Sequence, residues 1–386
     1  MDKGILVLIP SYNVAPTIAY VVSTAAEGLR EYFPDRDNLI LVSDGGSTDG
    51  TVEVVKALNI KDVPVKVERY PGIPGKGSAV MHGIRKAVEN GYKAVIMLDS
   101  DLRSIEPWWI SLLGMASSRY GLVTPLYTRH KHDGTITKTL AHPVISSVFN
   151  AGIRQPIGGD FGISEKLAKT LLDRVEDFSP AAYKFGIDFF ITSTAVAEKL
   201  PIAQADLGSK IHAPKDPAKH LKNMFLEVSE TVIRAIHRYY RPGLFSEPLQ
   251  VDLLMQCETW KCPQPVRVDI DDNVKRFLDE YQRHKLLLEK IIGETAVIKK
   301  VVDKLRKGEE NAFPDDLWAR LVLEHAIKYK QHGMEAVESL YVLWLGKVAS
   351  YLIDTANLSN EEAEKKVAQI AEAFRRYRHI LDEFFG

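Results

Sequence analysis

Several features are scarce or missing in this chain, and each one excludes a class of protein. The two cysteines, Cys257 and Cys262, do not have the spacing of a metal site, and such low usage fits a reducing cytosol. The formal net charge of −1 leaves no basic excess to hold nucleic-acid phosphates. No apolar run reaches the roughly 18–20 residues that span a bilayer, and the N-terminus lacks a signal-peptide pattern. We expect a soluble, cytoplasmic protein with no membrane span and no nucleic-acid partner.

Two phosphate-binding signatures are also missing from the glycine-rich segment Pro71–Ser78. It has neither the Walker spacing nor the Gly-x-Gly-x-x-Gly dinucleotide fingerprint, which argues against a P-loop and against a dehydrogenase. Its glycines nevertheless lie before an expected helix, where the backbone can approach a phosphate and the helix N-terminus favours an anion. Lys76 would add a full positive charge. The alternative is a turn with a solvated lysine.

The first half of the chain alternates apolar runs with amphipathic stretches, which predicts strands alternating with helices. This order indicates a mostly parallel sheet with helices on both faces. Ligands of such sheets gather at the carboxyl ends of the strands. The expected strands are Gly4–Pro10, Asn38–Ser43, Val65–Glu68 and the run that ends at Asp99, and the expected helices are 16–29, 51–58 and 77–89. The segments that follow three of the strands are Pro10–Asn13, Asp44–Gly50 and Asp99–Asp101.

The second half turns from a mixed pattern to a helical one. Between residues 121 and 212 we expect strands at 121–125 and 202–212, the second an edge or returning strand, and helices at 140–148 and 164–175. Ser359 with Glu362 has the pattern of a capping box. A proline-bearing stretch, 241–268, is expected to connect the two halves. The later helices are expected at 218–240, 273–292, 295–305, 315–329, 335–355 and 359–384.

Asp99 and Asp101 end the apolar run that starts at Ala94. Side chains two residues apart at the end of a strand point the same way, and two carboxylates so close together are costly unless a cation lies between them. A hard divalent metal that also holds a diphosphate would supply that cation. The alternative is an ordinary acidic turn.

The motifs in this order resemble the nucleotide half of the GT-A nucleotide-sugar glycosyltransferases. The segments that carry the resemblance are Leu8–Asn13, Val42–Asp49, Pro74–Gly77 and Asp99–Asp101. Further along, three segments resemble the retaining mannosylglycerate synthase and glucosyl-3-phosphoglycerate synthase families: Gln155–Asp160, Phe185–Asp188 and Gly208–His212. The resemblance covers roughly residues 4–215 and implies an α/β GT-A fold, a mostly parallel sheet with a helical C-terminal region. The expected domains are 1–215 (nucleotide-sugar half 1–101, acceptor half 102–215), a connecting part 216–268 and a helical part 269–386.

The resemblance also implies roles for individual residues. Asp101 and His212 would ligate Mg²⁺ or Mn²⁺, while Asp188 would hold sugar hydroxyls or orient the acceptor. Asp160 is the nearest carboxylate for a nucleophile, although retaining enzymes of this fold resemble front-face transfer, in which the diphosphate oxygen takes the acceptor proton. The nucleotide sugar would contact Pro10, Ser11, Asn13, Asp44, Lys76, Asp99, Ser100, Gln155, Gly158 and Gly159.

The acceptor segment is where the two resembling families differ. Arg129, Thr135, Thr137 and Lys215 are the expected acceptor residues, because the segment 129–137 resembles the carboxylate-binding segment of mannosylglycerate synthase. The 3-phosphoglycerate enzymes carry an arginine where this chain has Thr135, which argues against a phosphorylated acceptor. Lys131, Lys138 or Lys215 remain as sources of positive charge for a phosphate.

The leading hypothesis is a retaining, metal-dependent transfer of mannose or glucose to D-glycerate or 3-phosphoglycerate, which would make a compatible-solute glycoside. The donor would be GDP-mannose, GDP-glucose or UDP-glucose, which the sequence does not distinguish. The alternatives are a transferase to a lipid phosphate, similar to dolichyl-phosphate mannose synthase, and a sugar nucleotidyltransferase. The C-terminal helices offer a surface for a homodimer.

Overall fold

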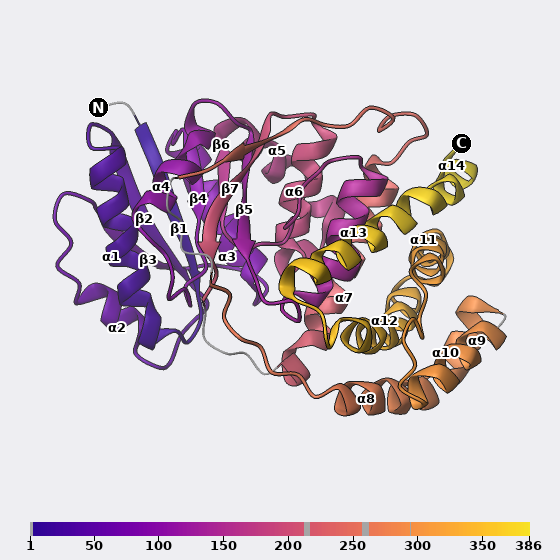
Figure 1. Ribbon diagram of the computed structural model, residues 1–386. Helices are drawn as coiled ribbons and strands as arrows, with labels where there is room; N and C mark the ends of the chain where they lie inside the picture. The colour runs from indigo at the N-terminus through magenta and orange to yellow at the C-terminus, as the bar shows by residue number, and fades with distance from the viewer. Residues whose placement is uncertain (1–2, 212–216, 257–261, 294) are drawn as a thin grey trace. The chain divides into compact units, whose positions relative to one another are not determined.

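The computed structural model describes residues 3–211, 217–256, 262–293 and 295–386 (Figure 1). The chain divides into two compact units, each built from three stretches of sequence. We call them the sheet unit (Met1–Thr128, Gly152–Ala218 and Leu249–Gln264) and the helical unit (Arg129–Ala151, Lys219–Pro248 and Pro265–Gly386). The sequence analysis placed residues 129–151 within a catalytic domain 1–215, whereas in the structure they pack within the helical unit.

Among the described residues, eight strands form one sheet in the order β3-β2-β1-β4-β6-β5-β7-β8. Neighbouring strands are parallel, except that β6 runs antiparallel to both β4 and β5. This topology confirms the predicted mostly parallel sheet. The strands are β1 (Lys3–Ser11), β2 (Asp37–Asp44), β3 (Val65–Arg69), β4 (Ala94–Met97), β5 (Leu122–Thr128), β6 (Phe161–Ser164), β7 (Ile202–Ser209) and β8 (Val251–Leu254).

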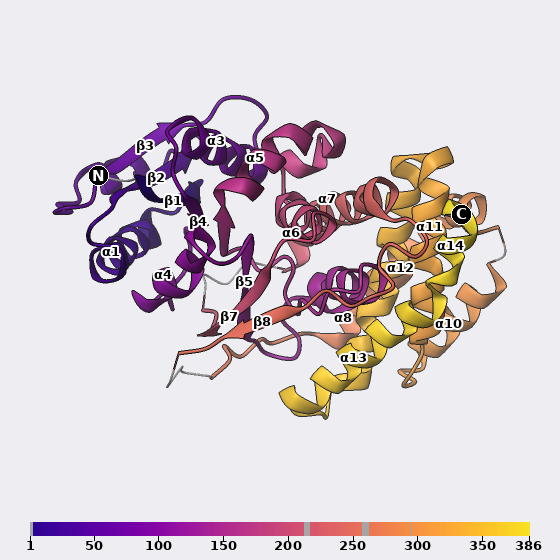
Figure 2. The same ribbon diagram turned by 90° about the horizontal axis from the view of Figure 1, so that it is seen from above.

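Helices cover both faces of this sheet, which is why its central strands are continuous apolar runs. Figure 2 shows α1 and α4 on one face and α3 and α5 on the other. Because β1 and β2 are parallel and in register, Ser11 and Asp44 end the two strands side by side. The helices are α1 (Ala15–Tyr32), α2 (Thr51–Lys56), α3 (Lys76–Glu89), α4 (Trp108–Leu113), α5 (Glu165–Arg174) and α6 (Ile187–Ala197).

The helical unit is organised around α12 (Met334–Thr355), which packs against α8 to α11. By length and composition this helix is also apolar enough to cross a membrane, but 89% of its most apolar window is buried inside the protein, as in a core helix. The predicted capping box of Ser359 and Glu362 is confirmed at the start of α13. The other helices are α7 (Pro217–Tyr239), α8 (Ile270–Arg283), α9 (Lys285–Ile292), α10 (Ala296–Arg306), α11 (Asp315–His332), α13 (Asn360–Tyr377) and α14 (His379–Phe385).

Several expected elements differ from the structure. The strand expected at 202–212 is returning but not an edge strand, because β8 pairs with it on its outer side. The edge strand is β8, which lies inside the stretch expected to be a plain connection. The sequence did not predict it, because a strand of four partly exposed residues has no clear hydrophobic pattern. The helix expected at 140–148 is confirmed, within a helical stretch 135–148 that contains two π-helical turns, Thr137–Ala141 and Val144–Val148. The long helices expected at 273–292 and 359–384 are each divided, at His284 and Arg378.

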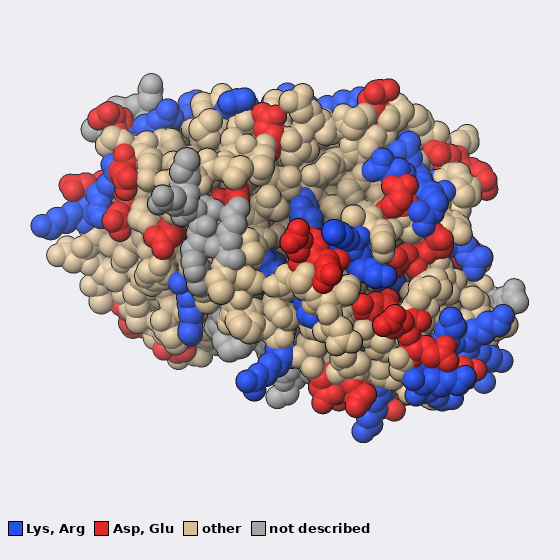
Figure 3. Space-filling view, viewed as in Figure 1, with Lys and Arg blue, Asp and Glu red and all other residues tan. Residues whose placement is uncertain are grey.

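Charged side chains of both signs are interspersed over the face drawn in Figure 3, in keeping with the net charge of −1.

Candidate functional site

The loops that follow β1 and β2 are tied together by hydrogen bonds. The Asn13 N–H donates to Ser47 Oγ, and Asn13 Oδ1 accepts from the Thr48 N–H, both at 2.9 Å. The Gly45 N–H donates to the Ser11 carbonyl at 2.8 Å. Asn13 has a φ of 52°, in the left-handed region that asparagine adopts more readily than most residues. These bonds hold the two loops as one polar rim at the carboxyl edge of the sheet.

Asp44 is the buried centre of this rim. Its Oδ1 accepts from the hydroxyls of Ser11 (2.9 Å) and Ser47 (2.6 Å), and its Oδ2 accepts from the N–H groups of Gly46 (2.7 Å) and Ser47 (2.8 Å). Burial raises the pKa of Asp44, but the hydrogen bonds from Ser47, Gly46 and Ser11 outweigh burial and hold the pKa below its usual value. Asp44 therefore shapes the loop as an ionised carboxylate with four protein donors.

The glycines before and within the first turn of α3 lie against protein backbone. A Cβ on Gly77 would lie 1.9 Å from the Ala182 carbonyl oxygen, and one on Gly75 would lie 2.5 Å from that of Tyr183. The Gly77 N–H also donates to the Lys184 carbonyl at 3.1 Å. The sequence suggested that these glycines let a phosphate approach. The geometry shows a different requirement, the close approach of the segment 182–184.

Lys76 projects from this turn into a cluster of carboxylates. Its Nζ lies 2.9 Å from Asp99 Oδ1 and 3.2 Å from Asp188 Oδ1. Burial opposes the charge on Lys76, but Asp188 and Asp99 outweigh it and raise the pKa of the ammonium above its usual value. Asp188 is in the first turn of α6, and its burial raises the pKa of that carboxyl, an effect that Lys76 counteracts. The structure thus brings together three residues that the sequence analysis had assigned to the site.

Lys210 is a fourth member of the cluster that sequence reasoning quoted within a motif but gave no role. It follows β7, and its Nζ donates to Asp99 Oδ2 (2.7 Å), Asp160 Oδ2 (2.8 Å) and the Gly158 carbonyl (2.9 Å). The same ammonium lies 5.1 Å from the centre of the Tyr127 ring. One signal was present in the sequence: a lysine directly after a buried strand needs a partner for its charge.

Asp160 is fully buried, and both of its oxygens accept hydrogen bonds. Its Oδ1 accepts from the Asp99 N–H at 2.7 Å, and its Oδ2 accepts from the Tyr127 hydroxyl at 2.6 Å as well as from Lys210. Burial raises the pKa of Asp160, while Lys210 counteracts the shift. This geometry favours a supporting role over the nucleophile role considered from the sequence, because a nucleophile needs an accessible oxygen lone pair.

The remaining residues expected at the nucleotide sugar lie in the same unit and mostly have protein partners. Gln155 is buried and donates to the Tyr127 carbonyl at 2.7 Å, and the Ser100 carbonyl accepts from the Thr17 hydroxyl at 2.9 Å. Gly159 has a φ of 94°, and a Cβ there would lie 2.2 Å from Asp99 Oδ2. Pro10 is part of β1, and Gly158 packs against Pro125.

The expected metal ligands are described only in part. Asp101 is half-buried after β4, whereas His212 lies outside the described residues. Within the described ranges, no three His, Cys, Asp or Glu side chains are grouped closely enough to hold a metal ion. Asp99, the second carboxylate of the pair, has an ammonium at each oxygen. The carboxylate of Asp101 suits a hard cation, but the described donors alone do not complete a site.

The expected acceptor residues Arg129, Thr135 and Thr137 belong to the helical unit, and Lys215 lies outside the described residues. Arg129 Nη1 lies 3.1 Å from Asp133 Oδ2, and the Thr135 carbonyl accepts from the Thr139 hydroxyl at 2.7 Å. Thr137 begins the first π-helical turn.

The two lysines suggested as phosphate ligands are engaged with backbone. Lys131 Nζ donates to the carbonyls of Thr355 (2.8 Å), Ala356 (2.7 Å) and Leu358 (2.7 Å). Lys138 Nζ donates to the carbonyls of His130 and Lys131, each at 2.8 Å. Both ammoniums therefore hold the segment 129–138 in place within the helical unit.

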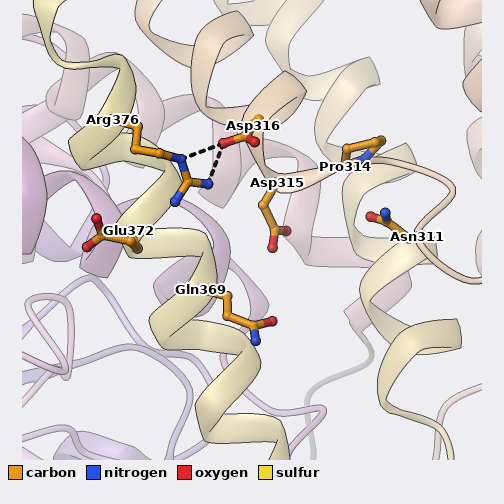
Figure 4. Close-up of a pocket in the computed structure, with 7 residues that line it drawn as sticks. All are labelled: Asn311, Pro314, Asp315, Asp316, Gln369, Glu372 and Arg376. Atoms are coloured by element: carbon orange, nitrogen blue, oxygen red, sulfur yellow. Dashed lines mark hydrogen bonds and ion pairs between the residues drawn. The ribbon is translucent and has the colours of Figure 1, made fainter.

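A polar cavity of about 310 Å³ in the helical unit is not part of this site (Figure 4). Its acidic side chains have cationic partners: Arg376 binds Asp316, and Lys347 lies 2.5 Å from Asp315. It is lined by Asn311, Pro314, Asp315, Asp316, Gln369, Glu372 and Arg376.

Residues 6–181 match the family model "Glycosyl transferase family 2". The match covers just under half of the chain and includes most of β1, all of β2 to β6 and the loops that follow β1 and β2, whereas Asp188 and Lys210 lie beyond it. Of the matched residues, 6–128 and 152–181 belong to the sheet unit and 129–151 to the helical unit.

Two curated relatives match over a shorter stretch. The glycosyltransferase AglJ of Haloferax volcanii is 37% identical over 98 residues, which are 25% of this chain and 27% of AglJ. The undecaprenyl-phosphate mannosyltransferase of Micrococcus luteus is 30% identical over 97 residues, which are 25% of this chain and 37% of that protein. The chain thus spans well under half the length of both.

Solved structures of glucosyl-3-phosphoglycerate synthase from Mycobacterium tuberculosis are also similar. One, in complex with Mn²⁺, UDP and phosphoglyceric acid, is 22% identical with a TM-score of 0.47 and covers 62% of this chain and 81% of the other. Another, with Mn²⁺, UDP-glucose and glycerol 3-phosphate, is 23% identical with a TM-score of 0.45 and covers 60% and 80%.

Proposed function

We propose that the protein is a hexosyltransferase that moves mannose or glucose from a nucleotide-diphosphate sugar to D-glycerate or 3-phosphoglycerate. The observation that carries this proposal is the cluster of Lys76, Asp99 and Asp188, of which Lys76 and Asp99 lie within the residues that match the glycosyl transferase family 2 model. The cluster lies beyond the carboxyl ends of parallel strands, where ligands of such sheets bind. The family match favours glycosyl transfer over nucleotidyl transfer.

Each residue of the site has a task in this proposal. The rim around Asp44 and Asn13 receives the nucleotide, and the Lys76 ammonium contacts the diphosphate. Asp188 accepts hydrogen bonds from the transferred sugar, which is positioned for attack by the acceptor hydroxyl on the side of the leaving group. The diphosphate oxygen takes the acceptor proton, so the protein acts by positioning and by stabilising charge.

We propose that Asp101 and His212 hold Mg²⁺ or Mn²⁺ in the working enzyme. Such a cation would neutralise negative charge on the departing nucleoside diphosphate. One carboxylate and one imidazole form a mixed donor set that Mn²⁺ accepts well. Titration of the protein with Mn²⁺, followed by electron paramagnetic resonance, tests this assignment without any substrate. Asp101→Ala and His212→Ala should weaken Mn²⁺ binding, while Asp35→Ala, which removes an exposed carboxylate from the same unit, should not.

For the acceptor, we propose that Arg129 binds the carboxylate of glycerate. Its guanidinium pairs with the carboxylate of Asp133 at 3.1 Å, and the same planar group can bind a substrate carboxylate through two parallel hydrogen bonds, which supports the proposal. The engagement of Lys131 and Lys138 with backbone carbonyls supports glycerate over a phosphorylated acceptor.

A second candidate is transfer of the sugar to a lipid phosphate. The observation that favours it is the match to the undecaprenyl-phosphate mannosyltransferase of Micrococcus luteus over 97 residues. This candidate shares the donor site with the first and differs in the acceptor alone.

A matrix of donors against acceptors tests both candidates. GDP-mannose, GDP-glucose and UDP-glucose are each combined with glycerate, 3-phosphoglycerate and a short-chain polyprenyl phosphate in detergent, and the anomer of each product is read by NMR. Transfer to glycerate with retention supports the first candidate, and transfer to the lipid phosphate alone supports the second. If no sugar is transferred from any donor to any of the three acceptors, both candidates are contradicted.

Variants at Arg129 separate the acceptor assignment from the overall function. Arg129→Ala should raise the KM for glycerate and leave the KM for the donor unchanged. Arg283→Ala is the matched control, because Arg283 also pairs with a carboxylate on its own segment, Glu280 at 2.7 Å. An unchanged glycerate KM in Arg129→Ala would remove the carboxylate clamp but not the donor chemistry.

A further inference from the structure

Five charged groups form one connected cluster in the sheet unit. Three are carboxylates (Asp99, Asp160 and Asp188) and two are ammoniums (Lys76 and Lys210). The two lysines bind opposite oxygens of Asp99, Lys76 at Oδ1 and Lys210 at Oδ2. Asp99 is therefore held from two sides.

The two lysines differ in how firmly they are held. The side chain of Lys210 is 4% exposed and donates to two carboxylates and the Gly158 carbonyl, over the face of Tyr127. The side chain of Lys76 is 16% exposed and pairs with the carboxylates of Asp99 and Asp188. The Lys210 ammonium makes three short hydrogen bonds in a buried site. If it moved away, Asp160 would be left as a buried carboxylate without a cation, which is strongly unfavourable. Lys210 is thus the fixed cation of the cluster.

Asp160 makes a second contact that positions Asp99. Its Oδ1 accepts from the backbone N–H of Asp99 at 2.7 Å, so it positions the main chain where Lys210 positions the side chain. The Tyr127 hydroxyl, at 2.6 Å, fixes the other oxygen of Asp160. The position of Asp99, the first residue of the Asp99-Ser100-Asp101 segment, is therefore set by its contacts with Asp160 and Lys210.

We propose that Lys210, Asp160 and Tyr127 form a brace that positions Asp99, and through it the Asp99-Ser100-Asp101 segment, for the diphosphate end of the donor. The three residues are positioning residues: they act through Asp99 rather than on the substrate. The inference rests on the proposed function where it names the donor. The brace itself is a statement about how Asp99 is held, and it has a test that needs no substrate.

The first test measures amide hydrogen exchange at Asp99. Lys210→Met and Asp160→Asn should raise the exchange rate of peptides that contain Asp99 to Asp101, because the acceptor of the Asp99 N–H, Asp160 Oδ1, loses the cation that holds its carboxylate in the first variant and loses its charge in the second. The matched control is Lys347→Met in the helical unit. Lys347 is also buried, and its ammonium also donates to a carboxylate, that of Asp315, and to a backbone carbonyl, that of Phe313 at 3.0 Å. Unchanged exchange at Asp99 in Lys210→Met would overturn the brace, whatever reaction the protein catalyses.

The second test separates positioning from simple charge neutralisation. Lys210→Met leaves Asp160 without its cation, so part of its effect is lost stability. The double variant Lys210→Met/Asp160→Asn removes both charges and should recover the melting temperature. It should still lower kcat/KM for the donor by about 10–100-fold, the usual effect of removing a residue that supports a ligand-binding carboxylate. Recovery of both stability and kcat/KM in the double variant would show that the pair neutralises charge only.

Tyr127→Phe completes the series. It keeps the ring beside Lys210 and removes only the hydroxyl that binds Asp160. We expect a smaller loss in kcat with an unchanged acceptor KM. If the wild-type protein transfers no sugar, the proposed function fails, and the exchange experiment still decides on the brace.

Discussion

The ammonium of Lys76 lies 2.9 Å from Oδ1 of Asp99, and this pair joins the first turn of α3 to the end of β4. Lys210 holds the other oxygen of Asp99 at 2.7 Å. Asp99 and Asp101 are therefore not equivalent, although they lie two residues apart in one acidic motif. Asp99 has the contacts of a supporting carboxylate, which leaves Asp101 as the better candidate for direct metal ligation.

Replacing Lys76 with methionine should change the pH dependence of the reaction. Burial raises the pKa of Asp188, and Lys76 counteracts part of that shift. Without the ammonium the pKa of Asp188 rises further, so the acidic limb of the kcat/KM profile should move to higher pH. Lys86→Met, on the exposed side of the same helix, is the control and should leave the profile in place. An identical acidic limb in both variants would show that Asp188 does not need to be ionised.

Gly77→Ala should destabilise the sheet unit strongly. The new Cβ would lie 1.9 Å from the backbone oxygen of Ala182, which cannot move as a flexible side chain would. Such overpacking typically costs about 1–3 kcal/mol. Gly152→Ala is the control, since a Cβ at Gly152 meets no atom within 4 Å. Urea denaturation should show a large difference between the two variants, and equal stability would contradict the packing account of this glycine.

Lys131→Met should lower the stability of the fold without changing the KM for the acceptor. The ammonium satisfies three carbonyls at the end of α12, and hydrogen bonds from a charged group are worth about 1.5–3 kcal/mol each. We expect a lower midpoint of unfolding together with an unchanged KM for glycerate and for 3-phosphoglycerate. Lys365→Met, an exposed lysine of α13, should affect neither quantity. A raised KM for 3-phosphoglycerate alone would restore Lys131 as a phosphate ligand.

His325 should make the helical unit sensitive to acid. It is fully buried between the Leu321 carbonyl and the Ser339 hydroxyl, and burial lowers its pKa from 6.5 to about 4. The unfolded chain therefore binds this proton more tightly than the folded one. The stability that the neutral imidazole contributes is present above about pH 6.5 and is lost as the pH falls towards 4, by about 3 kcal/mol in total.

The measurement for His325 is urea unfolding at several pH values between 7.5 and 4.5. His325→Gln cannot titrate, so its stability should fall less with acid than that of the wild type. His379→Gln, which removes an exposed histidine of the same unit, should reproduce the wild-type slope. Parallel slopes for the wild type and His325→Gln would show that groups other than His325 set the acid response.

The sequence predicted the part of the fold that rests on long apolar runs. Four of these runs became β1 to β4, with polar residues at their carboxyl ends where a ligand would bind. It missed β8, because four half-exposed residues in a proline-bearing stretch do not stand out from a connection. It also joined α8 to α9, since the helical pattern continues through His284 although the backbone there is not helical.

The sequence predicted most of the residues of the candidate site, but not the contacts among their side chains. Asp44, Lys76, Asp99 and Asp188 each follow an apolar strand or begin a helix, so their positions could be predicted. The role of Lys210 could not, because its partners Asp99 and Asp160 lie 111 and 50 residues away along the chain. Nor does the sequence distinguish a glycine that admits a phosphate from one that, like Gly77, admits another stretch of chain.

The strand β8, at the outer edge of the sheet, has a consequence for how the protein is made. Because Val251–Leu254 pairs with β7 only after the chain has passed through α7, the sheet stays open at that edge until residue 254 has left the ribosome. A fragment that ended near residue 215 would keep the pairing of β7 with β5 but leave its outer edge unpaired, and an unpaired edge strand invites aggregation. The sheet unit is therefore expected to be complete only after β8 has been made, and because each unit is built from three stretches of sequence, neither can be obtained by a single cut in the chain.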